Sequence, residues 1–223
     1  MTHHDSLQHL LQTRHSCRGF LDTPVPRDVI ETILQDAGRV PSWCNAQPWQ
    51  VILTSGASTE AFRQVMLDAF DTQGASTDFP PPSGYSGLRK ARRQTCGLQL
   101  YEAVGIERAD KAGRAAQMRE NYAFFGAPHV ALITTAAELG SYGALDCGGF
   151  ITAFCLSAQS QGVATIPQAA LAFYADTVRA HFDISEDQLI LAAISFGYAD
   201  MTHPANAFRT ERASLDEMVD WRD

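Results

Sequence analysis

The sequence has no apolar run that approaches the roughly 18 to 20 residues needed to cross a bilayer. Its first residues, MTHHD, also lack the apolar core of a secretory signal peptide. We therefore expect a cytoplasmic protein without a membrane-spanning helix.

Basic residues are in the minority. The chain has 17 lysines and arginines against 25 aspartates and glutamates, which gives a net charge of −8. This balance argues against a nucleic acid or an anionic membrane surface as the main partner. It does not argue against a small anion held in one local basic pocket.

Cysteine is also scarce. The chain has five cysteines, an odd number, and none lies in a CxxC pair. This pattern indicates reduced thiols in a cytosolic protein. Cys147 and Cys155 lie in an apolar segment, so we interpret them as packing residues rather than nucleophiles.

The signatures of several enzyme classes are absent. There is no GxGxxG after a strand, no Walker A loop, no GxSxG elbow and no HExxH or other metal-ligand spacing. His129 begins an apolar strand and is interpreted as a structural histidine. We assign no catalytic side chain and no metal site. An enzyme with this sequence would most simply take its reactivity from a cofactor.

Apolar periodicity predicts one globular domain over residues 1–223. Hydrophobic residues make up 45% of the chain and charged residues 19%, and no repeat or linker divides it. The order of elements favours a mixed α/β layer over a doubly wound fold. We expect helices over 6–14, 27–38, 58–70, 88–123 and 142–161, and strands over 49–54, 128–135, 163–166 and 189–197.

Two segments stand out from this pattern. Residues 72–88 contain three glycines and three consecutive prolines, which indicates an irregular stretch that is functional or mobile. Residues 142–161 are apolar or small nearly all round, so a helix there must be buried on every face. One domain of this size cannot easily bury such a helix, so we expect a subunit interface.

Three segments carry groups that could bind a ligand. Arg14–Arg18 (RHSCR) places two guanidinium groups and a hydroxyl together, which suits a phosphate or carboxylate, although a solvated helix end is the alternative. Pro41–Trp49 offers amides beside tryptophans and could bind the edge of a heteroaromatic ring, or be a capped turn. In the tail, Arg209 and Arg212 could close on an anion or be exposed charges.

In this order, these segments resemble the nitroreductase family of FMN enzymes. Its members open with R-[RH]-S-x-[RK], which Arg14–Arg18 matches, and continue with P-S-x-x-N-x-Q-P-W, which Pro41–Trp49 matches at every fixed position. They close with a glycine-ended strand and a basic segment, to which Gly197 and Arg209–Arg212 are similar. The likeness covers essentially the whole chain.

The resemblance implies an α+β fold with a mixed, largely antiparallel sheet flanked by helices. It also implies an intertwined homodimer with two FMN sites at the interface. By the family pattern, the FMN phosphate and ribityl chain are held by four residues of one subunit: Arg14, His15, Ser16 and Arg18. The other subunit supplies three more: Pro41, Ser42 and Asn45.

Two further contacts follow from the same pattern. Arg209 is the tail's phosphate contact, with Arg212 as the competing choice. Gln168 and Ala169 lie where the family packs backbone against the isoalloxazine ring. Many members have Glu-Gly or Gly-Gly nearby, so this pair departs from the pattern.

The implied chemistry is ping-pong hydride transfer from NADH or NADPH, through FMN, to a nitroaromatic or quinone-like acceptor. Residues 72–125 should shape the substrate pocket, with Trp43 and Phe124 as candidate substrate contacts. Core packing is the alternative for Phe124. Arg89, Arg92 and Arg93 could favour an anionic substrate such as a nitrobenzoate, or form a solvated helix face.

Two rival functions stay open on the sequence alone. One is another FMN reaction on the same scaffold, such as dehalogenation, ene reduction or flavin destruction. The other is a non-catalytic flavin-binding protein.

Overall fold

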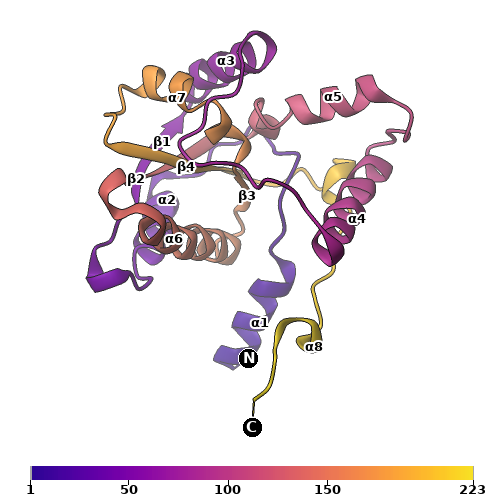
Figure 1. The fold of residues 1–223 in the computed structure, drawn as a ribbon, viewed down its shortest axis with the longest axis horizontal. Coiled ribbons are helices and arrows are strands. Elements are labelled where there is room, and N and C mark those ends of the chain that lie inside the picture. The colour runs from indigo at the N-terminus through magenta and orange to yellow at the C-terminus, as the bar shows by residue number, and fades with distance from the viewer. Residues whose placement is uncertain (1, 223) are drawn as a thin grey trace.

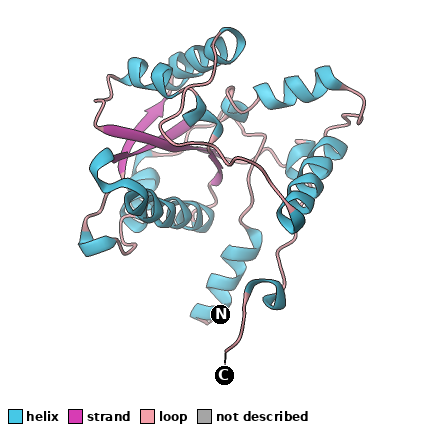
Figure 2. Ribbon diagram, in the orientation of Figure 1, coloured by secondary structure: helices cyan, strands magenta, loops and turns pink. Residues whose placement is uncertain are grey.

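The computed structural model describes residues 2–222 and is built around a four-stranded sheet (Figures 1 and 2). The strands lie in the order β1-β2-β4-β3, and every neighbouring pair is antiparallel. Parallel pairing occurs in isolated bridges such as Ser16–Thr165. The strands are β1 (Gln50–Ser55), β2 (His129–Ala136), β3 (Ala164–Gln168) and β4 (Gln188–Gly197).

Helices cover both faces of the sheet, so the expected α+β fold is confirmed (Figure 1). The strand β2 is buried almost throughout and alternates its side chains between two cores. The helices are α1 (His3–Thr13), α2 (Arg27–Ala37), α3 (Ala57–Thr72), α4 (Gly87–Ala103), α5 (Lys111–Arg119), α6 (Gly140–Ser160), α7 (Ala175–Phe182) and α8 (Leu215–Met218).

The two cores lie on opposite faces of the sheet. On one face, Phe62 and Met66 of α3 and Val178 of α7 pack against Val130 and Leu132 of β2. On the other face, buried side chains of α2 and α6 pack against the alternate residues of β2 and β4. The pair α4 and α5 stands beside this sandwich and has no buried residue in either helix (Figure 1).

Most of the expected elements form within a few residues of the predicted bounds. The helix expected over 88–123 is two helices, α4 and α5. The first helix is capped by Thr2 rather than Ser6, because the Asp5 side chain completes a capping box with Thr2. The helix α7 was missed, since its eight residues are too few for a clear apolar period.

The helix α6 is not buried on every face within this chain. Seven of its residues are buried, whereas Tyr142 and Leu145 are 57% and 69% exposed. By length and composition alone, the helical stretch Ala137–Ser160 could cross a bilayer. The sequence alone predicted no such helix, because no uninterrupted apolar run in the chain is long enough. A core helix meets the same criterion, and α6 packs against α2 and β3.

His129 is a structural residue, as expected. Its Nε2 accepts a hydrogen bond from the Val25 amide at 2.9 Å, and its Nδ1 lies 3.3 Å from the Thr54 carbonyl oxygen. Burial lowers the pKa of the imidazole, which keeps Nε2 available as an acceptor. The ring therefore ties the loop before α2 to the sheet.

The glycine- and proline-rich segment between α3 and α4 is held by a nearly buried ion pair. The Arg179 guanidinium contacts the Asp78 carboxylate at 2.9 Å, and their side chains are 11% and 15% exposed. Asp78 also accepts the Ile190 amide of β4 at 2.7 Å. The segment is irregular, as expected, but this contact pins it to the sheet.

Replacing Arg179 should therefore cost much more stability than replacing an exposed arginine. We expect Arg179→Ala to lower the free energy of unfolding by about 3 kcal/mol, because Asp78 loses its cation while nearly buried. The control is Arg119→Ala, which breaks a pair with Asp71 whose side chains are 43% and 44% exposed, and should cost less than about 1 kcal/mol. Urea unfolding at one protein concentration measures both losses, and equal losses would contradict the assignment.

Candidate functional site

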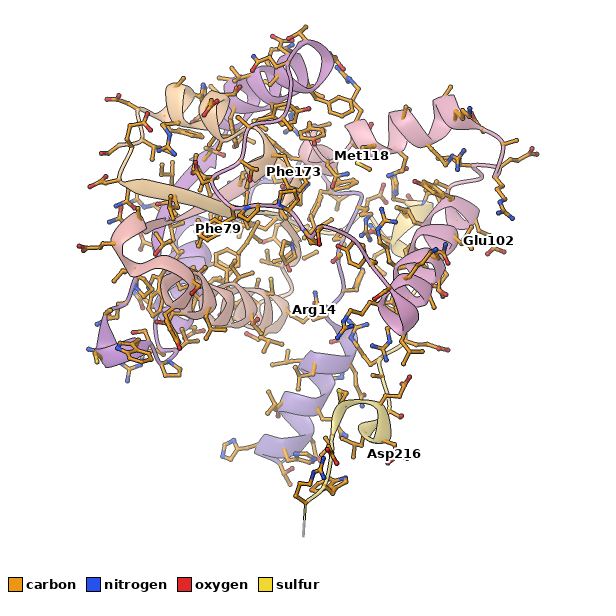
Figure 3. The ribbon with its side chains drawn as sticks, viewed as in Figure 1. Arg14, Phe79, Glu102, Met118, Phe173 and Asp216 are labelled. Atoms are coloured by element: carbon orange, nitrogen blue, oxygen red, sulfur yellow. The ribbon has the colours of Figure 1, made fainter. Side chains whose placement is uncertain are left out.

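The segment Arg14–Arg18 leaves α1 and runs along the edge of β3. The chain becomes extended at Arg14, and Ser16 forms a parallel bridge with Thr165. The Cys17 amide donates to the Thr165 carbonyl at 3.0 Å. Arg14 thus lies where α1 meets the body of the molecule (Figure 3).

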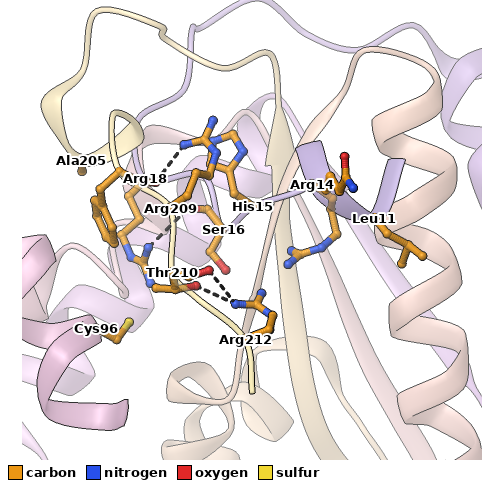
Figure 4. A pocket seen from close by; sticks show the side chains of 12 residues that line it. Leu11, Arg14, His15, Ser16, Arg18, Cys96, Ala205, Arg209, Thr210 and Arg212 are labelled. Carbon is orange, nitrogen blue, oxygen red and sulfur yellow. Dashed lines mark hydrogen bonds between the residues drawn. The ribbon is translucent and has the colours of Figure 1, made fainter. Parts of the chain in front are cut away.

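The chain's tail closes over this segment to form a basic pocket of about 280 Å³. Four arginines line it: Arg14, Arg18, Arg209 and Arg212 (Figure 4). Within residues 2–222, none of the four is in an ion pair. The pocket therefore carries positive charge that a bound anion would neutralise.

Three of these guanidinium groups, those of Arg18, Arg209 and Arg212, donate to backbone carbonyls rather than to carboxylates. Arg18 Nη1 donates to the Ser16 carbonyl at 3.3 Å. Arg209 Nη1 donates to the Asn206 and Phe208 carbonyls, both at 2.8 Å. Burial lowers the pKa of Arg18, but an arginine stays charged in spite of such a shift.

Asn206 holds the two halves of the pocket together, and sequence reasoning gave it no role. Its buried side chain accepts the Arg18 amide at 2.7 Å and donates to the Gly19 and Asp200 carbonyls, each at 2.9 Å. The only signal for this role in the sequence is that Asn206 comes shortly before the basic tail segment, and this signal is weak. Cys96 of α4 also lines the pocket, and no pattern in the sequence pointed to it.

His15 presents an unsatisfied acceptor to the same pocket. Its Nδ1 lies 3.1 Å from the Thr13 carbonyl, so Nδ1 carries the hydrogen and Nε2 is a lone pair. The Nε2 atom is buried and has no partner among the described residues. Burial lowers the pKa of His15, and the positive charges of Arg209, Arg14 and Arg18 lower it further. A neutral His15 suits a hydroxyl donor.

The loop Pro41–Trp49 contains a short 3-10 turn, Trp43–Asn45. Three residues of the loop, two of them in this turn, have backbone in the left-handed region. These are Cys44, Asn45 and Gln47, with φ of 48°, 58° and 48°. The Gln47 amide donates to Ser42 Oγ at 2.9 Å, which fixes the turn. Left-handed backbone at non-glycine residues costs free energy and is concentrated at functional sites.

The structure does not bring this loop and the basic pocket together within one chain. The Trp43 amide donates to Asp146 near the start of α6, whereas Thr13 accepts from Gln159 near its end. Thirteen residues separate these two anchor points, which corresponds to about 20 Å along a helix. Pro41, Ser42 and Asn45 therefore lie far from the arginines of the same chain.

Gln168 points inward rather than toward a ligand. Its Nε2 donates to the Asn121 carbonyl at 2.8 Å, and its Oε1 accepts from Ser195 Oγ at 2.5 Å. Only the backbone of this residue can therefore face a ligand. Ala169 is exposed and lies about 13 Å beyond Thr165 along the strand direction.

The two aromatic substrate candidates have different environments. Trp43 is 61% exposed and its ring lies 4.7 Å from that of Tyr142, beside a recess of about 210 Å³. Phe124 is fully buried and packs 5.1 Å from the Phe62 ring in the core. The substrate contact expected of Phe124 is therefore corrected to core packing, the alternative that the sequence left open.

Comparison with known proteins identifies the family and the fold. The model for the family described as "Nitroreductase family" matches residues 11–198. The chain belongs to the nitroreductase family. It is 36% identical to nitroreductase NfnB of Mycolicibacterium smegmatis, over 94% of this chain and 90% of that protein. It is 36% identical to a 4-nitrobenzoate reductase of Nocardioides sp., over 94% of this chain and 87% of that one.

The structural similarity to the nitroreductase family is equally extensive. The crystal structure of the FMN-dependent nitroreductase NfnB from Mycobacterium smegmatis in complex with NADPH superposes with a TM-score of 0.94 at 34% identity. That match covers 99% of each chain. The expected family resemblance is thus confirmed by sequence and by fold.

The neutral His15 gives the nitroreductase chain a testable pH dependence. The folded-state pKa lies below the ordinary value of 6.5, so below about pH 6.5 the unfolded chain binds more protons than the folded one. The free energy of unfolding should therefore fall as the pH drops below that value. In His15→Asn this fall should be smaller, because one of the two depressed histidines is gone. Urea unfolding between about pH 7.5 and about pH 5 measures the slope, and identical slopes would refute a depressed pKa.

Proposed function

We propose that this chain is an FMN-dependent NAD(P)H oxidoreductase that reduces nitroaromatic or quinone-like acceptors by a ping-pong sequence. The observation that carries the proposal is the four-arginine pocket beside β3 in a chain of the nitroreductase family. Similar solved structures include FMN- and NADPH-dependent nitroreductases. The curated relatives include reductases of 4-nitrobenzoate and of nitrobenzene.

The residues of the pocket fit the phosphate and polyol of FMN. A phosphate dianion offers several acceptor oxygens, which match guanidinium forks that lack carboxylate partners. We assign the phosphate to Arg14, Arg18 and Arg209, with the Ser16 hydroxyl beside them. Arg212 is turned to Thr210, since its Nη1 donates to the Thr210 hydroxyl and carbonyl.

His15 is assigned to the polyol rather than to the phosphate. Its Nε2 is an acceptor, and a ribityl hydroxyl can donate to it, whereas a phosphate oxygen cannot. The exposed residues Pro167 and Ala169 would then face the ring, at the far end of β3 from the arginines. The phosphate and the ring would thus lie along one edge of the sheet.

When bound, FMN supplies the redox chemistry by accepting a hydride from NAD(P)H and delivering it to the acceptor. The side chains of this protein bind and orient the partners and limit the access of water. No side chain is assigned a proton-transfer or covalent step. Trp43, exposed and in tilted contact with Tyr142, would offer a flat surface to an aromatic substrate.

We further propose that the working unit is a homodimer. The loop with Ser42 and Asn45 is anchored on α6 about 20 Å along the helix from the point where the segment before Arg14 is anchored, so a second copy must supply the loop to complete the site. The exposed face of α6 around Tyr142 and Leu145 offers an apolar surface for that copy.

We also infer a cytoplasmic location. All five cysteines are free, and three of them are buried. Burial raises the pKa of Cys147 to about 11 and raises that of Cys155, so these thiols stay protonated and unreactive. Free thiols in this number are typical of a reducing compartment.

Removing one arginine of the pocket should weaken FMN binding. In Arg14→Ala and in Arg18→Ala, the loss of a charge-assisted phosphate contact should cost about 1.5 to 3 kcal/mol of binding free energy. Quenching of FMN fluorescence during titration of apoprotein measures the affinity. The control is Arg27→Ala, whose guanidinium is exposed on α2 and pairs with Glu31, and which should bind FMN as the wild type does. Wild-type affinity in both pocket variants would remove the assigned role.

A mixed dimer tests whether the site is shared between subunits. Homodimers of Arg14→Ala and of Asn45→Ala each carry the defect in both sites. In a heterodimer of the two variants, a shared site leaves one pocket with both residues intact and the other with neither. Half of the heterodimer sites should therefore bind FMN with wild-type affinity, measured by titration of tag-purified heterodimer. If no site regains that affinity, the pocket is built within one chain.

A further inference from the structure

Basic charge is concentrated on the helix pair α4 and α5. Residues 87–119 carry eight basic and three acidic side chains, a local charge of +5 in a chain of −8. Two of the eight are in ion pairs, Arg92 with Glu217 and Arg119 with Asp71. Among the described residues, the other six are in no ion pair. This segregation indicates a site for an anion.

Three of the unpaired arginines meet in one groove between the two helices. Its volume is about 570 Å³, within the range of small-molecule sites. Arg93 and Tyr101 of α4, Arg108 of the connecting segment and Arg114 of α5 line it. The groove therefore combines three guanidinium groups with one aromatic ring.

A glycine keeps this groove open. Gly97 lies in the interior of α4, where glycine is the least favourable residue after proline. A Cβ atom at Gly97 would meet nothing within 4 Å, so no close packing requires the glycine. The missing side chain leaves room in the groove for a ligand.

The groove adjoins the pocket assigned to the FMN phosphate, because Cys96 lines both. It therefore lies at the phosphate end of β3, away from the exposed residue Ala169 that would face the ring. A compact aromatic acid must sit against the ring to be reduced, so it would not reach this groove. A dinucleotide is long enough to place one end at the ring and the other end here.

We propose that the groove between α4 and α5 binds the adenosine end of NADPH, with Arg93, Arg108 and Arg114 on its 2′-phosphate. Arginine forks match a phosphate monoester, and the Tyr101 ring can stack on the purine. NADH lacks this phosphate, so the groove selects NADPH. The inference rests on the proposed function, whose hydride donor it specifies.

The first experiment uses FMN-loaded Arg108→Ala/Arg114→Ala. We expect kcat/KM for NADPH to fall about tenfold or more, and kcat/KM for NADH to change by less than about twofold. The matched control is Lys90→Ala, an exposed basic residue of α4 that does not line the groove and should leave both values unchanged. An unchanged ratio of NADPH to NADH in the double variant overturns the inference.

A second experiment does not depend on the flavin. Calorimetric titration with 2′,5′-ADP and with 5′-AMP should show tighter binding of 2′,5′-ADP to the wild type and no preference in the double variant. Gly97→Leu, which favours the helix and fills the groove, should weaken 2′,5′-ADP without lowering the melting temperature. Equal binding of the two nucleotides by the wild type overturns the inference.

The outcomes separate this inference from the function on which it rests. If neither nucleotide reduces the bound flavin, the proposed function fails, while the 2′,5′-ADP titration still tests the groove. If the double variant raises only the KM for 4-nitrobenzoate, the arginines recognise an acceptor carboxylate, and the nucleotide assignment is wrong.

Discussion

The hydrogen bond from the Cys17 amide to the Thr165 carbonyl decides where the anion pocket forms. It lays the residues after α1 along the free edge of β3, where the next strand of a sheet would otherwise pair. Arg14 and Arg18 are thereby carried to one place on the sheet edge. Without that contact, two arginines at a spacing of four would be surface charges on a helix end.

The pocket is unusual because its four arginines have no carboxylate partner among the described residues. The chain has more carboxylates than basic groups, yet none of the four pocket arginines pairs with one in the described residues. Like charges held together cost free energy in the empty state. A bound anion removes that cost, so the repulsion in the empty pocket becomes part of the driving force for binding.

Periodicity and turn chemistry predicted most of the fold. The four strands were found because β-branched and apolar residues mark them clearly, and β2 in particular is apolar without interruption. The short helix α7 was missed, and one long helix was expected where α4 and α5 form. These errors arise because tertiary contacts, rather than the local sequence pattern, determine whether a short helix forms and where one helix ends and the next begins.

The candidate site was predicted in part. The order of Arg14–Arg18 and Pro41–Trp49 pointed to the correct family, which the comparisons confirm. The direction of the Gln168 side chain and the burial of Phe124 could not be read from the sequence. Both depend on partners distant in the chain, such as Ser195 for Gln168, and no local spacing encodes them.

The three hydrogen bonds of Asn206 have a kinetic consequence. Two of the three join residues that are 188 and 187 positions apart, so the pocket closes only after nearly the whole chain has been synthesised and folded. Contacts of such long sequence separation form slowly. A ligand of this pocket would therefore bind the native state alone and shift the folding equilibrium toward it by mass action. A larger supply of the cofactor would then raise the fraction of newly made chains that is folded.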